Sequence, residues 1–589
     1  MPPRDLRDLA QRLRPGLGPI PQVVRETPKT YRLGDTETFW VSDQDSNRHF
    51  QITAELRYMT DHLYMWVQQG AEVNQRDLER SALRFERETY PRNREFFGSE
   101  WTPGVDGDPR LFILHAKGIG SSIAGYYSSA DEYSRLANPY SNEKEMFYVS
   151  LDGLEPNTFF YDSVLAHEFQ HMIHWYQDRN EDTWVNEGLS ELAAQINGYE
   201  RGESAFLFTR SPETQLTTWT DSPQGNAAHY AAAYLFMSYF LDRFGEATTR
   251  AVIASPLNGA AGFDDALAAN GHPERFDDIF ADWVVANLLD DTDLLGVRYG
   301  YREIDLRRVL PSTTHRTYPV QREGQLPPYA TEYVTLAGTG AVTIIFTGTT
   351  ETRLVATDAH SGRYAFWGNR ADDSDAHLTR QFDLSNASSA TLEAWLWYSL
   401  EDGFDYAYAL ASTDDGTTWT VLPGNTTTTR NPVGNAFGPG LTGTSGSGAE
   451  PAWVQEEYDL TPFAGRQVLV RFEYVTDDAV NYPGLLIDDV SVPEIGYHED
   501  FEAGEGGWQA VGFLRTDNRL PLRWLIQVVE RSGWRAQVVR RLDLGADGRG
   551  TWTVAGLGSG RDAVLIISAL APATTETATY AYEVRRAGG

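Results

Sequence analysis

The chain has 589 residues, with 83 acidic and 49 basic side chains, a formal net charge of −34 and no cysteine. This length is sufficient for several domains, each with its own core. An acidic chain without a basic stripe excludes nucleic acid and anionic membranes as expected partners. The fold cannot depend on disulfides, and the sequence has no run of about 18 apolar residues that would predict a membrane span.

Residues 1–28 contain no apolar signal-peptide core, and we expect them to be an N-terminal arm or the remnant of a pro-segment. Residues 29–317 mix strand and helix patterns and predict an α+β domain. Two apolar runs, RLFILHA and EMFYVSL, have strand character and precede a helix. We expect the second of these, Met146–Ser150, to be the sheet edge where a peptide substrate adds as an extended strand.

The predicted helix that follows contains the sequence HEFQH at residues 167–171. His167 and His171 are four residues apart, so they share one helix face and can bind one metal ion. Glu168 lies beside them, where it can act as general base on a metal-activated water. This pattern is typical of a zinc peptidase, and a catalytic zinc normally has a third protein ligand.

Two patterns compete for that third ligand. The pattern HExxHxxGxxH requires glycine at position 174 and histidine at position 177, but the chain has His174 and Gln177 there. We therefore expect His174 to pack or to support the ligands. The later sequence NEGLSE is similar to the N-E-x-x-S-[DE] motif of thermolysin-like gluzincins. This resemblance implies that Glu187 is the third zinc ligand and that the supporting residues behind the ligands are Asn186 and Glu191.

Residues 227–245 form an apolar run that predicts a helix ending at Gly245. Zinc peptidases use a hydrogen-bond donor to stabilise the oxyanion that forms during attack on the carbonyl. The run resembles the helix that carries the catalytic tyrosine of gluzincin aminopeptidases, which implies Tyr230 as this donor. His229 and Tyr234 are the alternatives, and all three side chains also fit a role in packing alone.

The resemblance extends over residues 100–191, in the phrases EWTPGVDGDPR, SNEKEMFYVS, LAHEFQHMIHW and WVNEGLSELA. These phrases resemble the hyicolysin-type family of secreted bacterial neutral metallopeptidases. That family implies a thermolysin-like gluzincin catalytic domain, here residues 29–317, and a secreted, extracellular location.

From about residue 318 the chain changes to short alternating stretches separated by Gly, Thr and Asp, a pattern that predicts all-β structure. Residues 361–495 resemble the MAM-like β-sandwich of immune-inhibitor-A-type peptidases in FWGNRADDSDAHLTRQFDLS, DYAYALASTDDGTTWTVL and GLLIDDVSV. Related jelly-roll modules hold structural calcium, which implies candidate ligands that also fit as ordinary loop charges: Asp372, Asp375, Asp488 and Asp489.

The stretches before and after this module share one pattern, in which apolar residues alternate and Gly and Thr mark the turns. We expect residues 318–360 and 496–589 to form one β-sandwich into which the module is inserted, and three domains in series are the alternative. The predicted fold class is therefore multidomain, α+β followed by all-β.

The predicted function is a zinc-dependent endopeptidase that hydrolyses extracellular proteins as a monomer, with Ca²⁺ as an additional structural ion. One alternative is a zinc aminopeptidase, which commonly anchors the free amine with a GxMEN motif that this sequence does not contain. Another is a surface or glycan-binding protein with a decayed peptidase domain. Binding of glycans or cell surfaces by the β domains is also compatible with proteolysis.

Overall fold

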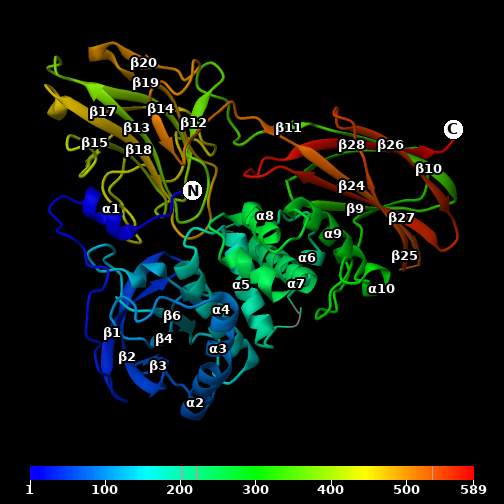
Figure 1. The fold of residues 1–589 in the computed structure, drawn as a ribbon, viewed down its shortest axis with the longest axis horizontal. Coiled ribbons are helices and arrows are strands. Elements are labelled where there is room, and N and C mark those ends of the chain that lie inside the picture. The colour runs from blue at the N-terminus through cyan, green and yellow to red at the C-terminus, as the bar shows by residue number, and fades with distance from the viewer. Residues whose placement is uncertain (201, 203, 221–222, 534, 589) are drawn as a thin grey trace. The chain divides into compact units, whose positions relative to one another are not determined.

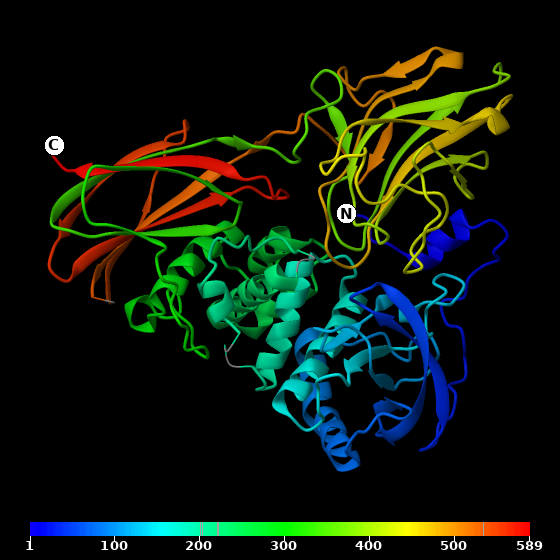
Figure 2. The same cartoon turned by 180° about the vertical axis from the view of Figure 1, so that it is seen from behind.

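The computed structural model describes all residues of the chain except 201, 203, 221–222, 534 and 589 (Figures 1 and 2). These residues form two compact units, each assembled from separate parts of the sequence. The first unit comprises Met1–Asp182, Ala193–Glu200 and Ala359–Asp517, and the second comprises Thr183–Leu192, Arg201–Asp358 and Asn518–Gly589. Among the described residues, no helix combines the length and the apolar character needed to cross a membrane.

A six-stranded mixed sheet forms the scaffold of the N-terminal part of the first unit, in the order β1-β2-β3-β4-β6-β5. β4 runs parallel to β3 and β6, and the remaining pairs are antiparallel. Every residue of β4 and β6 is buried, as expected for strands with parallel neighbours and two covered faces. The strands are β1 (Thr36–Asp43), β2 (Arg48–Met59), β3 (Leu63–Gln68), β4 (Leu111–Ala116), β5 (Gly125–Tyr127) and β6 (Met146–Ser150).

Strand β5 is the edge strand of this sheet on the side of β6, and β1 is the edge strand on the opposite side. The prediction that Met146–Ser150 forms the edge is wrong, because β6 lies between β4 and β5. β5 has only three residues, all half-buried, so no alternating pattern in the sequence could reveal it.

Helix α4 (Phe159–Gln177) contains the HEFQH sequence and packs on β5 and β6. It begins after Thr158, whose side chain accepts a hydrogen bond from the N–H of Tyr161. The Asn93 amide donates to the Ala166 carbonyl at 2.9 Å and so ties α4 to its neighbour α3. The other helical elements of this part are α1 (Leu6–Leu13), α2 (Gln75–Arg84), the π-helical turn η1 (Phe85–Thr89), α3 (Tyr90–Phe97) and the 3-10 turn η2 (Ser129–Glu132).

The segment Ala359–Asp517, here called the module, is a two-sheet β-sandwich within the first unit. One sheet has the order β17-β14-β19-β12-β22 with β20 beside β19, and the other has the order β16-β15-β18-β13-β21. Burial alternates over the first six residues of β14, the pattern of a strand with one face on the core, and its last four residues are all buried. The elements are β12 (Ala365–Trp367), β13 (Asp375–Asp383), β14 (Thr391–Ser399), β15 (Tyr406–Ser412), β16 (Thr420–Leu422), β17 (Val454–Asp459), η3 (Thr461–Phe463), β18 (Gln467–Val475), β19 (Gly484–Val492), η4 (Pro493–Ile495), β20 (Tyr497–Glu499), β21 (Gln509–Val511) and β22 (Leu514–Thr516).

The second unit contains most of the remaining helices. α7 breaks at Gly245, whose φ of 77° and ψ of 174° lie outside the helical range, and this confirms the predicted end of the apolar helix. The Tyr333 hydroxyl donates to the Val284 carbonyl at 2.7 Å, which ties α9 to the β-sandwich of the same unit. The helices are α5 (Thr183–Ile196), whose residues up to Leu192 belong to this unit, α6 (Phe206–Thr209), α7 (Pro223–Ile253), α8 (Gly259–Ala269), α9 (Phe276–Leu289) and α10 (Thr292–Leu295).

The β-sandwich of the second unit draws its strands from both sides of the module in sequence. Its sheets have the orders β26-β10-β28-β8 and β25-β24-β27-β9-β7, with a short β11-β23 pair. β10 pairs with β26 and β28, and β9 pairs with β27, so the chain leaves this sandwich, forms the module and returns. The strands are β7 (Thr313–His315), β8 (Val320–Leu326), β9 (Thr331–Leu336), β10 (Gly340–Gly348), β11 (Glu351–Thr352), β23 (Leu520–Pro521), β24 (Arg523–Ser532), β25 (Arg535–Leu542), β26 (Arg549–Leu557), β27 (Arg561–Leu570) and β28 (Ala578–Arg586).

The module extends further along the chain than the range 361–495 expected from the sequence. β20, β21 and β22 pair with the module strands β19, β13 and β12, so residues 497–516 belong to the module. Alternation of apolar residues identifies a strand but not its partner, which explains the displaced boundary.

Asn518 links the segments on either side of the module. It accepts hydrogen bonds from the N–H groups of Leu354 at 2.8 Å and Val355 at 3.0 Å, and donates to the Val355 carbonyl at 3.0 Å. Its φ of 59° is left-handed, a conformation that asparagine and glycine adopt more readily than other residues.

We expect Asn518→Gly to lower the free energy of unfolding by about 2 to 3 kcal/mol, because two buried N–H groups lose their acceptor without added backbone strain. The matched control is Arg519→Ala, which removes an exposed ion pair to Glu351 at 3.2 Å and should change stability little. Urea unfolding of both variants, followed by tryptophan fluorescence, measures the difference. Equal effects of the two substitutions would contradict the role of Asn518.

Candidate functional site

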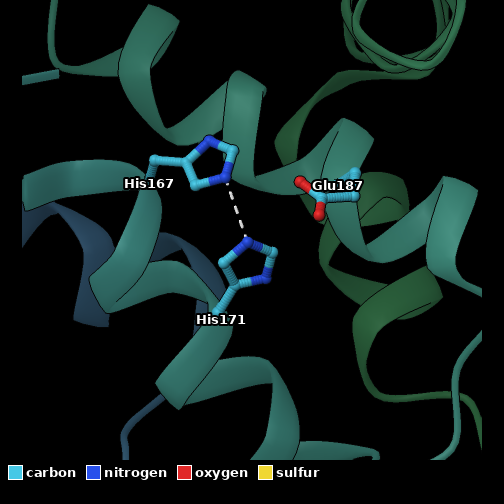
Figure 3. Close-up of side chains that lie close together, drawn as sticks. All are labelled: His167, His171 and Glu187. Atoms are coloured by element: carbon cyan, nitrogen blue, oxygen red, sulfur yellow. Dashed lines mark hydrogen bonds between the residues drawn. The ribbon is translucent and has the colours of Figure 1, made fainter. Parts of the chain in front are cut away.

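Helix α4 presents two imidazoles to one point. His167 and His171 are both half-buried, and their Nε2 atoms lie 3.0 Å apart (Figure 3). Two tetrahedral Zn–N bonds of about 2.05 Å would separate their nitrogen atoms by about 3.3 Å, so the pair fits a zinc ion. Glu168, the residue between them in sequence, is only 5% exposed.

Glu187 on α5 completes a group of three ligands. Its carboxylate points toward the two imidazoles, and the ligand atoms of His167, His171 and Glu187 all lie within 4.8 Å of one another (Figure 3). Two imidazole nitrogens and a carboxylate oxygen are a ligand set typical of catalytic zinc, with the fourth position open. The fold thus brings together the three ligands that the two sequence motifs predict.

A glycine after Glu187 fixes how α5 packs within the second unit. A Cβ atom on Gly188 would lie 2.8 Å from Cγ of Met237 and 3.0 Å from the Ala233 carbonyl oxygen, so α5 and α7 approach backbone to backbone. Trp184, one turn earlier on α5, stacks on Phe263 with ring centroids 5.6 Å apart. Gly188 was not among the predicted site residues, although a glycine inside a helix is a recognisable signal of close packing.

Tyr230 and His229 lie on α7, one turn or slightly more before Ala233. The Tyr230 ring meets Trp219 edge-on at a centroid distance of 4.8 Å, and the His229 ring lies 5.7 Å from the same indole. Burial lowers the pKa of His229, which favours the neutral imidazole. Ala233, three residues after Tyr230, is the point where α7 approaches Gly188 of α5. The role of Tyr230 as oxyanion donor stays a prediction.

Edge strand β5 approaches the predicted general base. A Cβ atom on Gly125 would lie 3.0 Å from Oε1 of Glu168, 2.8 Å from Cγ1 of Val164 and 2.7 Å from the Tyr148 carbonyl oxygen. Only glycine therefore allows β5 to pass this close to α4. Sequence reasoning missed Gly125, because the short GYY segment carries no signal that relates it to residue 168.

The expected supporting residues lie on the two motif helices. The Ser190 hydroxyl donates to the Asn186 carbonyl at 3.0 Å, so this part of the motif stabilises α5 itself. Glu191 follows Glu187 by one helical turn, and its pairing with an imidazole stays a prediction. His174 is 1% exposed and lies one turn beyond His171, in keeping with the expected packing role.

The four aspartates expected to bind calcium occupy three different places in the module. Asp372 accepts from the Asn481 amide at 2.9 Å, and Asp375 pairs with Arg12 at 2.7 Å. Asp488 accepts from the Ser361 N–H at 3.0 Å, and Asp489 accepts from the Ser361 hydroxyl at 2.8 Å, so these two hold the start of the module. Among the residues that the structure describes, these four aspartates do not occur together in one group of potential metal ligands, and their calcium binding stays a prediction.

A different acidic group converges in the module. Ligand atoms of Glu401, Asp405 and Asp477 lie within 4.8 Å of one another. Burial, reinforced by the neighbouring carboxylates, raises the pKa of Asp405 to about 7 and that of Glu401 to about 11. Glu401 and Asp405 lie in the loop before β15, whereas Asp477 lies in the loop after β18, more than 70 residues later. This separation in sequence explains why no motif predicted the group.

Comparison with known proteins identifies the module. Residues 342–518 match the family model described as Immune inhibitor A-like, MAM domain. The chain therefore contains a MAM-like module of the immune inhibitor A type. This match covers the predicted module and the strands β20, β21 and β22 that the sequence analysis had assigned elsewhere.

Three curated relatives have stretches similar to this chain. Pre-pro-metalloprotease PrtV of Vibrio cholerae serotype O1 (strain M66-2) is 30% identical over 145 residues, 25% of this chain and 15% of the relative. Immune inhibitor A of Bacillus thuringiensis subsp. alesti is 26% identical over 132 residues, 22% of this chain and 17% of the relative. Bacillopeptidase F of Bacillus subtilis (strain 168) is 25% identical over 127 residues, 21% of this chain and 7% of the relative. The chain thus aligns with a small part of each relative, in the region of the module and not at the zinc-site residues.

We expect His171→Ala to abolish stoichiometric zinc binding, because the remaining two ligands cannot hold a catalytic zinc. His174→Gln is the matched control on the same helix and should retain zinc. Inductively coupled plasma mass spectrometry after gel filtration measures the zinc content, and circular dichroism verifies that both variants are folded. Retention of zinc by His171→Ala together with its loss from His174→Gln would contradict the ligand set.

Proposed function

We propose that this chain is a zinc-dependent endopeptidase. The observation that carries the proposal is the convergence of His167, His171 and Glu187 within 4.8 Å, with Glu168 beside them on α4. The similarity to PrtV, which is named a metalloprotease, also supports the proposal, although the aligned residues lie in the region of the module. We also propose, from the sequence motifs, that the enzyme is a gluzincin of the hyicolysin type.

His167, His171 and Glu187 would hold the metal, and zinc bound there lowers the pKa of a water ligand to about 7 and polarises the substrate carbonyl. Glu168 accepts a proton from the attacking water and then donates it to the leaving amine. Tyr230 donates a hydrogen bond to the carbonyl oxygen as that oxygen gains negative charge, and His229 is the alternative donor. Asn186 and Glu191 hold the ligands in position from behind.

The sheet edge supports an extended peptide as the substrate. Within the described part of the chain, β5 ends the sheet order and has no strand on its outer side, and Gly125 brings β5 close to Glu168. A peptide that adds to β5 as a further strand would present its carbonyl groups beside the general base. An open strand edge accepts an internal segment of a protein, and this favours an endopeptidase over an aminopeptidase.

The sequence supplies a candidate residue for each role in a zinc peptidase: the three ligands, the general base and the oxyanion donor. This favours an enzyme over a glycan-binding domain that has lost its peptidase activity. We propose that the protein is secreted and monomeric and that its β domains contact cell surfaces or glycans in addition to stabilising the fold. A glycan array probed with the full chain tests the last point.

We expect Glu168→Gln to retain zinc and to lower kcat/KM for peptide cleavage about a thousandfold, because the amide cannot accept the proton from water. The assay is digestion of a peptide library with and without a zinc chelator, read by mass spectrometry. Glu95→Gln, at a surface position of α3, is the control and should leave cleavage unchanged. Near-wild-type cleavage by Glu168→Gln would sink the proposed mechanism.

We also propose a structural calcium ion in the module, held by Glu401, Asp405 and Asp477 with Asp372 nearby. Hard carboxylate oxygens suit calcium, and the raised pKa of Asp405, to about 7, reflects burial and negative charge that a divalent cation would offset. Asp375, Asp488 and Asp489 have other partners and are less suited to this ion.

In a calcium chelator, the melting temperature should fall as pH rises from about 4 to about 7. The folded state retains a proton on Asp405 that the unfolded chain loses near pH 4, so folding becomes less favourable across this window. Calcium at pH 7 should reverse the fall, and Asp405→Asn should reduce both effects. Differential scanning calorimetry measures them, and the same melting curves for wild type and Asp405→Asn, with and without calcium, would contradict the proposal.

A further inference from the structure

The N-terminal residues 2–14, here called the strap, are built into the first unit. Helix α1 buries Leu6, Leu9, Ala10 and Leu13, each at most 2% exposed. These side chains pack in one cluster with Tyr408, Trp419 and Phe437 of the module and with Ala137 of the loop that follows η2. Figures 1 and 2 show α1 beside the module strands.

Arg12 is the main polar anchor of the strap. Its guanidinium donates to Asp375 at 2.7 Å and pairs with Glu473 at 2.7 Å, and the Glu473 side chain is 0% exposed. The Trp419 N–H donates to the Arg12 carbonyl at 2.9 Å. Without Arg12, the buried Asp375 would keep His377 at 2.9 Å and the buried Glu473 would keep Arg471 at 3.3 Å, but no guanidinium would bridge the two carboxylates.

The residues before α1 form an isolated antiparallel β-bridge with the module, between Pro3 and Ser374. The Asp375 N–H donates to the Pro2 carbonyl at 3.0 Å, and the Arg4 N–H donates to the Asp373 carbonyl at 2.6 Å. The Arg4 side chain also pairs with the Asp373 carboxylate, and both side chains are only 5% exposed. Basic side chains of the strap thus meet acidic side chains of the module.

The strap also contacts the region that carries α4. Arg14 donates to the Ala137 carbonyl at 2.9 Å with one nitrogen and to the Ala436 carbonyl of the module at 3.2 Å with another. Next to the strap, the Asn180 amide donates to the Met1 carbonyl at 3.1 Å. Asn180 lies in the loop after α4, the helix that carries His167 and His171.

We propose that the strap fastens the module to the α4-bearing part of the first unit, so that both fold and unfold as one cooperative body. The module is then a part of the peptidase core and not a tethered accessory domain. This inference goes beyond the proposed activity, because it concerns only the folded chain. It would hold even if the zinc site had another function.

Hydrogen exchange of the full chain, read by mass spectrometry, tests the strap. Arg12→Ala should accelerate amide exchange at least about tenfold in three segments at once: the strap, the module strand β15 and residues 134–138. Arg7→Ala is the matched control on the same helix, since the Arg7 side chain forms a long ion pair with Asp5, at 3.8 Å, and both side chains are partly exposed. It should leave exchange in all three segments unchanged.

Arg12→Lys covers the case in which Arg12→Ala does not fold. Lysine keeps the charge but cannot bridge both carboxylates with a planar fork, so exchange should rise in the same three segments by a smaller factor. Faster exchange confined to the strap, in either folded variant, would show that α1 only rests on the module and would overturn the proposal. Equal effects of Arg7→Ala and Arg12→Lys would overturn it as well.

Discussion

The candidate zinc site imposes one geometric constraint on the fold: three ligand atoms must reach a single point while a fourth position stays open. The four-residue spacing on α4 supplies two imidazoles, with Nε2 atoms 3.0 Å apart. The third ligand comes from α5, and Gly188 allows the next turn of this helix to pack against the α7 backbone. Within the first unit, Gly125 allows the edge strand β5 to pass beside Glu168 on α4. Two glycines thus place rigid elements around the site.

Negative charge is the second constraint on this chain, whose formal net charge is −34. Two arrangements compensate the negative charge of buried carboxylates in this fold. Around Asp375 and Glu473 the strap supplies Arg12 as a guanidinium partner. Around Glu401, Asp405 and Asp477 carboxylates converge and their pKa values rise, which is the condition under which a bound cation or a retained proton stabilises the folded state. We therefore expect the stability of the module to depend on pH and on divalent cations.

Much of the catalytic architecture could be predicted from the sequence, because its signals are local. The HEFQH spacing predicts two zinc ligands on one helix face and NEGLSE predicts the third, and the structure brings these three candidates together. Gly245 marks the helix break that the structure contains. The signals that failed are non-local. A three-residue edge strand, β5, has no pattern of its own, and the strands β20 to β22 did not reveal that their partners lie in the module. The acidic group around Asp405 and the strap contacts of Arg12 join residues from distant parts of the chain, so only the fold brings them together.

The most direct test of the central claim is a crystal structure of the zinc-loaded protein, with anomalous diffraction data collected on both sides of the zinc absorption edge. The account predicts an anomalous peak about 2.0 to 2.2 Å from Nε2 of His167, Nε2 of His171 and a carboxylate oxygen of Glu187. A zinc peak among Asp375, His377 and Glu473 instead, or zinc coordinated by His167 and His171 without Glu187, would contradict it.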